Sequence, residues 1–374
     1  MTKSTTAAAP GMPGCAPSAP AAERERTLEA PQTRESGPYL PLRASGKQTA
    51  WLLAAVVVLV LVCAASLAVG ARGLPPESVW QALSRFDPDN GSHAVVRARI
   101  PRTVLGLLAG GALGLAGAAM QGIARNPLAD PGIMGVNAGA ALAVVTGIYV
   151  FGVSSLTGYI WFAFTGAAGA AVVVYLVASL GREGATPVKL ALAGAALSAG
   201  LYSLMNVVLV SSQDTLDRFR FWQVGGIAGR DWSVVLPGVP FLVAGALIVL
   251  FTGRILNSLA LGDDVARGLG QRVGLVRGVT ALGIVLLCGS ATALAGPIGF
   301  VGLVIPHAVR FLTGPDYRWI LPFSLVLAPV LLLGADIIGR VVLLPSEVPA
   351  GIMTALVGAP VFVWLIRRGK GAGL

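Results

Sequence analysis

Ionisable side chains are scarce within the apolar stretches of this chain, and two of them could do chemistry. His307 lies in "GLVIPHAVR" and Asp336 lies in "LLLGADIIGR". A carrier driven by protons needs buried acids or histidines arranged as a relay. A lone histidine beside Pro306 is more often a structural hydrogen-bonding group. If the protein transports, we therefore expect its energy to come from outside this chain.

Sequence motifs of the common enzyme classes are absent. No GxxxxGK[ST], HExxH or GxSxG occurs, although a phosphate-binding loop, a zinc site or an activated serine would need one of them. The three cysteines, Cys15, Cys63 and Cys288, show no CxxC or Cys/His spacing, so they do not indicate a metal site. We predict no catalytic residue, no metal site and no cofactor in this chain.

The composition predicts that membrane-spanning helices position the polar residues of this chain. The 374 residues are 55% hydrophobic and 12% charged, whereas a soluble domain carries about 25% charged residues. Apolar runs of about 17–25 residues, each long enough to cross a bilayer, recur along the chain. The sequence thus indicates an all-α polytopic membrane protein. We predict ten transmembrane helices at approximately residues 51–70, 101–123, 136–153, 157–180, 188–210, 235–254, 276–296, 299–312, 318–342 and 349–366.

Two regions differ from these spans. Residues 1–47 are rich in Ala, Pro, Glu, Arg and Ser, which is typical of a disordered tail. Residues 215–224 are too short and too charged to cross a membrane, but they carry Phe219, Phe221 and Trp222, which favour an interfacial helix. We predict a tail over 1–47 and one membrane domain over 48–370.

The placement of basic residues predicts the orientation of the chain in the membrane. Ten spans put both termini on one side, and roughly two thirds of the 27 lysines and arginines fall on that side. We therefore expect both termini in the cytoplasm. The net charge of +10 fits loops that meet anionic lipid. The sequence lacks a basic surface interleaved with aromatic residues, so we do not expect nucleic acid as a partner.

Small residues in the second span recur every fourth position. Gly106, Gly110, Gly114 and Gly122 follow this spacing, with Ala118 completing the series. Such a stripe lets another helix approach closely. Packing within one subunit is the favoured interpretation, and a dimer interface is the alternative.

The loop over residues 257–277 has an apolar face of its own. Leu261, Val265, Ala266 and Leu269 stand at helical spacing within charged surroundings. A solvated loop needs no such face, whereas a loop that binds a soluble partner does. Docking onto a partner and simple packing both remain open from the pattern alone.

Several ordered motifs give the chain a family resemblance. It resembles the FecCD-like permeases, the membrane subunits of ABC importers for iron-siderophore, haem or vitamin B12 uptake, over roughly residues 50–370. The motifs are "RIPRTVLGLLAGGALGLAGAAMQGIARNPLADPGIMGVNAGA", "WQVGGIAGRDW", "LNSLALGDDVARGLG", "ALAGPIGFVGLVIPHAVR" and "LPSEVPAGIMTALVGAPVFVWLI".

The resemblance implies a type II importer permease, similar to the vitamin B12 importer, in a bacterial cytoplasmic (inner) membrane. It implies pairing with a second copy or a close homologue, two ATPase subunits that bind ATP and Mg²⁺, and an extracytoplasmic substrate-binding protein. Residues 257–272 match the family's coupling-helix loop. The implied ATPase-docking residues are Leu261, Gly262, Asp263, Ala266, Arg267, Leu269 and Gly270.

The resemblance also assigns residues to the two ends of the pathway. Arg99, Arg102 and Arg340 match positions that dock the binding protein, although anchoring helix ends at lipid headgroups is an alternative. Thr186, Pro187 and Val188 match the cytoplasmic gate. Pro187 and Val188 stand where the vitamin B12 member has small hydroxyl residues, which disfavours vitamin B12 as the substrate.

We therefore expect a permease subunit for a ferric-siderophore-type chelate, which is not itself an enzyme. A vitamin B12 or haem permease is the alternative within the class. A stand-alone ion-coupled carrier and a non-transporting membrane scaffold are the alternatives from other classes. The scarcity of buried acids argues against the carrier, and broken, Gly- and Pro-rich helices argue against the scaffold.

Overall fold

The computed structural model describes residues 45–71, 73–180 and 186–370. The predicted tail over 1–47 lies outside these ranges, except for residues 45–47, which belong to the first helix. The described part of the chain is helical and contains no strand.

Ten helical segments correspond to the ten predicted spans, which confirms the fold class. Eight are long and apolar enough to cross a membrane, and α4 and α13 are shorter apolar helices. The segments are α1 (Ser45–Ala68), α3 (Gly91–Ala124), α4 (Val136–Phe151), α5 (Leu156–Ser179), α6 (Pro187–Ser211), α8 (Trp232–Val235) continuing into α9 (Val239–Phe251), α12 (Val273–Ala295), α13 (Val301–Thr313), α14 (Tyr317–Val342) and α15 (Ala350–Lys370).

Short helices connect these segments. A short helix, α7 (Gln213–Gln223), occupies the region predicted to be interfacial, and the loop predicted to be the coupling loop holds α10 (Gly253–Ala260) and α11 (Asp263–Gly268). The interfacial position of α7 and the coupling role of the loop stay predictions. The helix α2 (Pro76–Ser84) was not predicted. Pro75 is the N-cap of α2 and Pro76 is its first residue, where a missing N–H costs nothing.

The second span begins ten residues before the predicted start at 101. Asn90 caps α3 by accepting a hydrogen bond from the Ser92 amide at 2.9 Å. Pro101 lies inside the helix and does not begin it. The boundary was misplaced because proline is common in a first helical turn. With 34 residues, α3 is about 50 Å long at 1.5 Å per residue.

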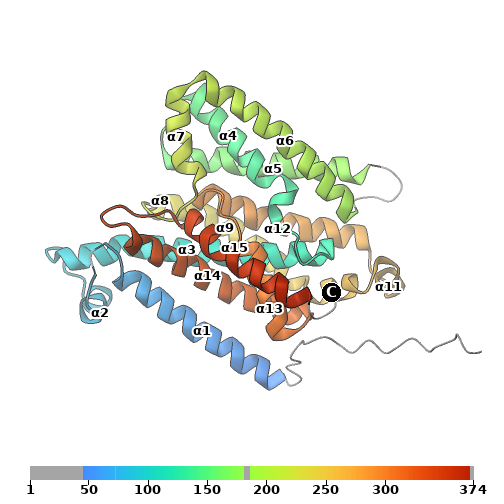
Figure 1. The fold of residues 1–374 in the computed structure, drawn as a ribbon, viewed down its shortest axis with the longest axis horizontal. Coiled ribbons are helices and arrows are strands. Elements are labelled where there is room, and N and C mark those ends of the chain that lie inside the picture. The colour runs from blue at the N-terminus through green and yellow to red at the C-terminus, as the bar shows by residue number, and fades with distance from the viewer. Residues whose placement is uncertain (1–44, 72, 181–185, 371–374) are drawn as a thin grey trace, which may run out of the picture. The chain divides into compact units, whose positions relative to one another are not determined.

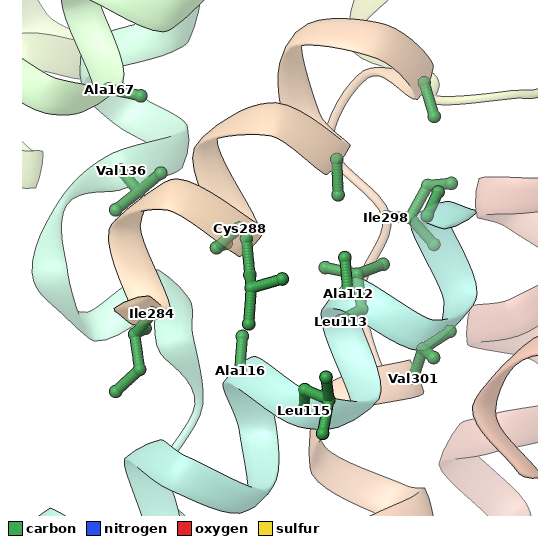
Figure 2. Close-up of a cluster of buried hydrophobic side chains, with 14 of the residues drawn as sticks. Ala112, Leu113, Leu115, Ala116, Val136, Ala167, Ile284, Cys288, Ile298 and Val301 are labelled. Carbon is green, nitrogen blue, oxygen red and sulfur yellow. The ribbon is translucent and has the colours of Figure 1, made fainter. Parts of the chain in front are cut away.

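Helix α3 is the centre of the fold, and it packs against α12, α13 and α14 (Figure 1). Its middle is fully buried, and alanines and leucines from Ala112 to Ala116 meet Ile284 and Cys288 of α12 (Figure 2). Burial of this apolar surface within the bundle leaves α3 little contact with lipid.

The glycine stripe of α3 faces α14 of the same chain. A Cβ at Gly110 would lie 2.6 Å from the Pro329 Cα, and one at Gly122 would lie 3.2 Å from the Tyr317 ring. Gly106 and Gly114 meet Leu333 and Ala328 in the same way. These contacts show intramolecular close packing of α3 and α14.

The outermost helices expose apolar surface instead. Within the most apolar 18-residue segment of each helix, the share of buried residues is 6% in α1, 17% in α6 and 28% in α15. The corresponding share in α3 is 83%. Helices α4 to α7 form one group, and α1 lies on the other side of the central helices (Figure 1). The exposed faces of these helices are suited to lipid or to another membrane subunit.

Candidate functional site

The chain presents two polar ends with different chemistry. Helix α3 begins beside α2 and ends beside α11 (Figure 1). We call these the α2 end and the α11 end. The predicted ATPase-docking residues lie at the α11 end, and the predicted binding-protein-docking arginines lie at the α2 end.

At the α11 end, the short helix α11 and the residues that flank it form an exposed apolar face, which is called the apolar face of α11 below. The side chains of Leu261, Val265 and Leu269 are 68%, 48% and 64% exposed. Ala266 is fully buried and faces the bundle. Gly262 and Gly270 flank the helix with φ angles of 118° and 80°, which other residues rarely adopt. The two glycines thus let α11 turn its apolar face outward.

Two arginines hold α11 in place through one carboxylate. Asp263 pairs with Arg125 at the end of α3 and with Arg277 of α12, the latter at 3.0 Å. Burial lowers the pKa of Arg125, and the nearby charge of Arg277 lowers that pKa further. Asp264 and Arg267 form a separate exposed pair at 2.9 Å. Asp263 therefore links α11 to the end of α3 and to α12.

The turn after α3 is shaped by a buried carboxylate. Asp130 caps the 3₁₀ turn Pro131–Met134 by accepting a hydrogen bond from the Gly132 amide at 2.7 Å. Burial raises the pKa of Asp130, and the hydrogen bond from the Gly132 amide opposes that effect. The role of Asp130 in this structure is a cap at the start of a helical turn.

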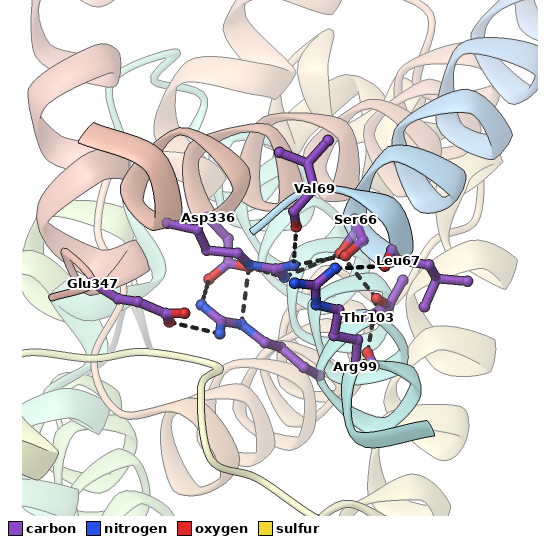
Figure 3. A network of polar contacts seen from close by, with 9 residues as sticks. Ser66, Leu67, Val69, Arg99, Thr103, Asp336 and Glu347 are labelled. Carbon is purple, nitrogen blue, oxygen red and sulfur yellow. Dashed lines mark hydrogen bonds and ion pairs between the residues drawn. The ribbon is translucent and has the colours of Figure 1, made fainter. Parts of the chain in front are cut away.

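At the α2 end, charged side chains from α3 and α14 form a network (Figure 3). Asp336 accepts hydrogen bonds from Arg102 Nε at 3.1 Å and Arg102 Nη2 at 2.8 Å, and also from Arg340 Nε at 2.9 Å. Arg102 Nη1 reaches Glu347 Oε2 at 2.7 Å. Arg99 donates to the carbonyl groups of Leu67 and Ala68 at the end of α1.

Arg340 and Arg102, two of the three predicted docking arginines, differ in accessibility, and the docking role of the third, Arg99, stays a prediction. Arg340 is 1% exposed and also donates to the Ser66 carbonyl at 2.6 Å and to the Val69 carbonyl at 3.1 Å. An enclosed guanidinium offers no surface to another protein, so in this conformation Arg340 ties α14 to α1. Arg102, 12% exposed, lies at the edge of the network. Its docking role stays a prediction.

Two further polar residues at this end were not predicted. Arg230 and Glu347 line a cavity of about 140 Å³ together with Arg102 and Asp336. Arg230 Nε has no hydrogen-bond partner in the described part of the chain, and burial lowers the pKa of its guanidinium. The sequence motif "GGIAGRDW" contains Arg230, but only the fold brings it close to Arg102.

The predicted gate residues lie at the start of α6. Thr186 Oγ1 accepts a hydrogen bond from the Lys189 amide at 3.4 Å, so Thr186 caps the helix, and Pro187 occupies its first position. Val188 is 67% exposed. The preceding residues, 181–185, lie outside the described ranges. The gate assignment stays a prediction.

Ten apolar helical segments around an enclosed central helix define a multi-pass helical membrane protein. The sequence matches the FecCD transport family over residues 58–368. The chain belongs to this family.

Relatives with known names extend this assignment. The chain is 44% identical over 328 residues to the probable siderophore transport system permease protein YfiZ of Bacillus subtilis, covering 87% of this chain and 98% of that protein. It is 47% identical over 316 residues to the ferric enterobactin transport system permease protein FepD of Escherichia coli, covering 84% and 93%. It is 34% identical over 318 residues to the hemin transport system permease protein HmuU of Yersinia pestis, covering 84% and 94%.

A solved structure has the same fold. It is a metal-chelate type ABC transporter in an inward-facing conformation, with a TM-score of 0.75 and 29% sequence identity. The match covers 86% of this chain and 99% of that chain.

Proposed function

We propose that this chain is the permease subunit of an ATP-binding cassette importer for a ferric-siderophore-type iron chelate. The observation that carries the proposal is the exposed apolar face of α11, with Leu261, Val265 and Leu269 turned away from the bundle. Exposure of this apolar face to water is unfavourable in a protein that works alone, whereas a partner ATPase can bury the face.

The named relatives support the substrate class. The relatives at 44% and 47% identity are named for siderophore transport and for ferric enterobactin transport, and the hemin relative is less similar at 34%. A haem permease is the alternative within the family, and a vitamin B12 permease is the next. The chelate is selected mainly by the extracytoplasmic binding protein, because this chain presents few polar groups along its spans.

We propose that two permease subunits, either two copies of this chain or this chain with a close homologue, enclose the pathway. The exposed helices α6 and α15 supply apolar surface for this pairing. Two ATPase subunits dock at the α11 ends and hold ATP and Mg²⁺. A binding protein docks at the α2 ends. The α11 end then faces the cytoplasm, and both termini are cytoplasmic in a bacterial inner membrane.

An ion-coupled carrier fits the structure less well. Asp336, the carboxylate buried in α14, is held by Arg102 and Arg340. A proton-relay acid must be accessible to bind and release a proton during transport, whereas this carboxylate is enclosed and bonded to two guanidinium groups. The chain therefore needs an external energy source.

The experiment that tests the substrate is uptake by proteoliposomes that contain the permease, its ATPase and its binding protein. Ferric siderophores, haem and vitamin B12 are offered separately with ATP inside. We expect accumulation of a ferric siderophore alone. Accumulation of haem or vitamin B12 in its place would overturn the substrate assignment.

A further inference from the structure

A cavity of about 420 Å³ lies at the α11 end of the bundle, apart from the apolar face of α11. It opens between the last turn of α3, helices α10 and α13, and the start of α14. Gln121, Arg125, His307, Arg310 and Tyr317 line it. Its volume is in the range of small-molecule sites, and its lining combines positive charge with uncharged polar groups.

Buried polar atoms in the lining have no partner within the described residues. His307 is 4% exposed, and neither ring nitrogen makes a hydrogen bond. Gln121 is fully buried; its Nε2 donates to the Leu303 carbonyl at 3.2 Å, but its Oε1 accepts nothing. Buried polar groups are normally satisfied. These three atoms therefore indicate an occupant that can both donate and accept hydrogen bonds.

Positive charge at this cavity exceeds negative charge. Arg310 Nη2 donates to the Tyr317 hydroxyl at 2.7 Å, and no carboxylate in the described part of the chain pairs with Arg310. Arg125 shares the carboxylate of Asp263 with Arg277. Two guanidinium groups thus share one carboxylate and a third has none, which favours an anionic occupant.

We propose that this cavity binds a phosphate group carried on a polyol, with phosphate oxygens at Arg310 and Arg125 and a hydroxyl group donating to Gln121 Oε1. A neutral imidazole offers one donor and one acceptor, so His307 complements a phosphate oxygen and a hydroxyl at the same time. Basic pockets between membrane helices are suited to the headgroups of anionic lipids. A soluble polyol phosphate has the same chemistry. The inference is independent of the transported chelate.

The test uses the purified full chain in lipid nanodiscs made of phosphatidylcholine. One arm titrates glycerol 3-phosphate from solution and measures the thermal unfolding midpoint. The other arm adds phosphatidylglycerol to the nanodiscs and measures retained lipid by native mass spectrometry. Saturable binding in either arm supports the proposal, and the arm that responds identifies a soluble phosphate or a lipid headgroup as the source.

Variants locate the binding. Arg310→Gln should weaken it by about tenfold or more because a guanidinium–phosphate contact is lost. Gln121→Glu should also weaken it, because the variant adds a negative charge to the cavity that holds the phosphate. Arg318→Gln is the matched control, since Arg318 is an exposed arginine paired with Asp316 and does not line the cavity. If Arg310→Gln fails to fold, binding to Arg310→Lys is measured by the same titration.

Two results would overturn the proposal. The first is no binding in either arm, which would mean that the cavity holds only water. The second is binding that Arg310→Gln and Gln121→Glu leave unchanged, which would place the anion elsewhere on the protein.

Discussion

Arg102 of α3 and Asp336 of α14 form a two-point ion pair, with Nε to Oδ2 at 3.1 Å and Nη2 to Oδ1 at 2.8 Å. The same carboxylate also holds Arg340, one turn later in α14. Asp336 is therefore shared by the two helices and is 1% exposed. It fixes the α2 end of the α3–α14 contact, while the glycine stripe lets the two helices approach along their length.

Replacing Asp336 with asparagine should destabilise the protein. The change leaves Arg340 buried and Arg102 nearly buried without their carboxylate, and breaking a buried pair in this way costs about 3–5 kcal/mol. A thermal unfolding scan in detergent should show a much lower midpoint. Asp264→Asn is the control, because its pair with Arg267 is exposed. A midpoint equal to that of the wild type would show that the network contributes nothing to stability.

Replacing Gly110 with alanine should disturb the α3–α14 contact, because the added Cβ would lie 2.6 Å from the Pro329 Cα. Overpacking of this kind costs about 1–3 kcal/mol. Gly334→Ala is the matched control on α14, where nothing lies within 4 Å of the added atom. Expression level and unfolding midpoint should fall for the first variant only. Equal behaviour of the two variants would contradict the close packing.

Charge placed on α11 should uncouple the ATPase without unfolding the permease. Leu269→Glu alters a side chain that is 64% exposed, so the fold should tolerate it. Binding of the ATPase should weaken by about tenfold or more if this leucine is buried at the centre of the interface. Leu83→Glu on α2, also exposed at 53%, is the control at the opposite end. Undiminished ATPase binding by Leu269→Glu would remove α11 from the interface.

Replacing Glu347 with glutamine should strengthen docking of the binding protein. Glu347 neutralises Arg102 at 2.7 Å and is 35% exposed, so it occupies a position that a partner carboxylate could take. Removing its charge should raise affinity by about two- to fivefold, mostly through faster association. Glu77→Gln on the neighbouring α2 controls for net charge. Weaker or unchanged binding would mean that Arg102 does not meet an acidic partner.

The buried carboxylate of Asp130 predicts a pH dependence of stability. Its pKa in the folded state is raised above the ordinary value of 3.8 by burial. The folded state therefore binds the proton more tightly, and stability falls as pH rises from the unfolded pKa through the folded pKa. Asp130→Asn keeps an oxygen for the Gly132 amide but cannot ionise. Its unfolding midpoint should decline less across this pH window; an equal decline would assign the effect to other groups.

The spans could be predicted because continuous apolar runs of sufficient length leave few alternatives to a membrane helix. The close packing along the glycine stripe could also be predicted, since a four-residue spacing puts small residues on one face of α3. The start of α3 was misplaced because Pro101 sits inside a helix that Asn90 caps. Neighbouring helices can compensate for an interior proline in a membrane, and sequence alone does not show that compensation.

The charged site was only partly predictable. Arg340 follows Asp336 by four residues, so their pairing within one helix was available from spacing. The third partner, Arg102, is 234 positions away from Asp336, and only the packing of α3 against α14 brings them together. For the same reason the burial of Arg340 and the position of Arg230 beside Arg102 could not be foreseen.

The most direct test of the central claim is iron uptake by proteoliposomes that contain this permease with and without its ATPase. With binding protein and radiolabelled ferric siderophore outside, the account predicts accumulation only when the ATPase and internal ATP are both present. An imposed proton gradient should have no effect on the permease alone. Accumulation driven by that gradient without the ATPase would contradict the account.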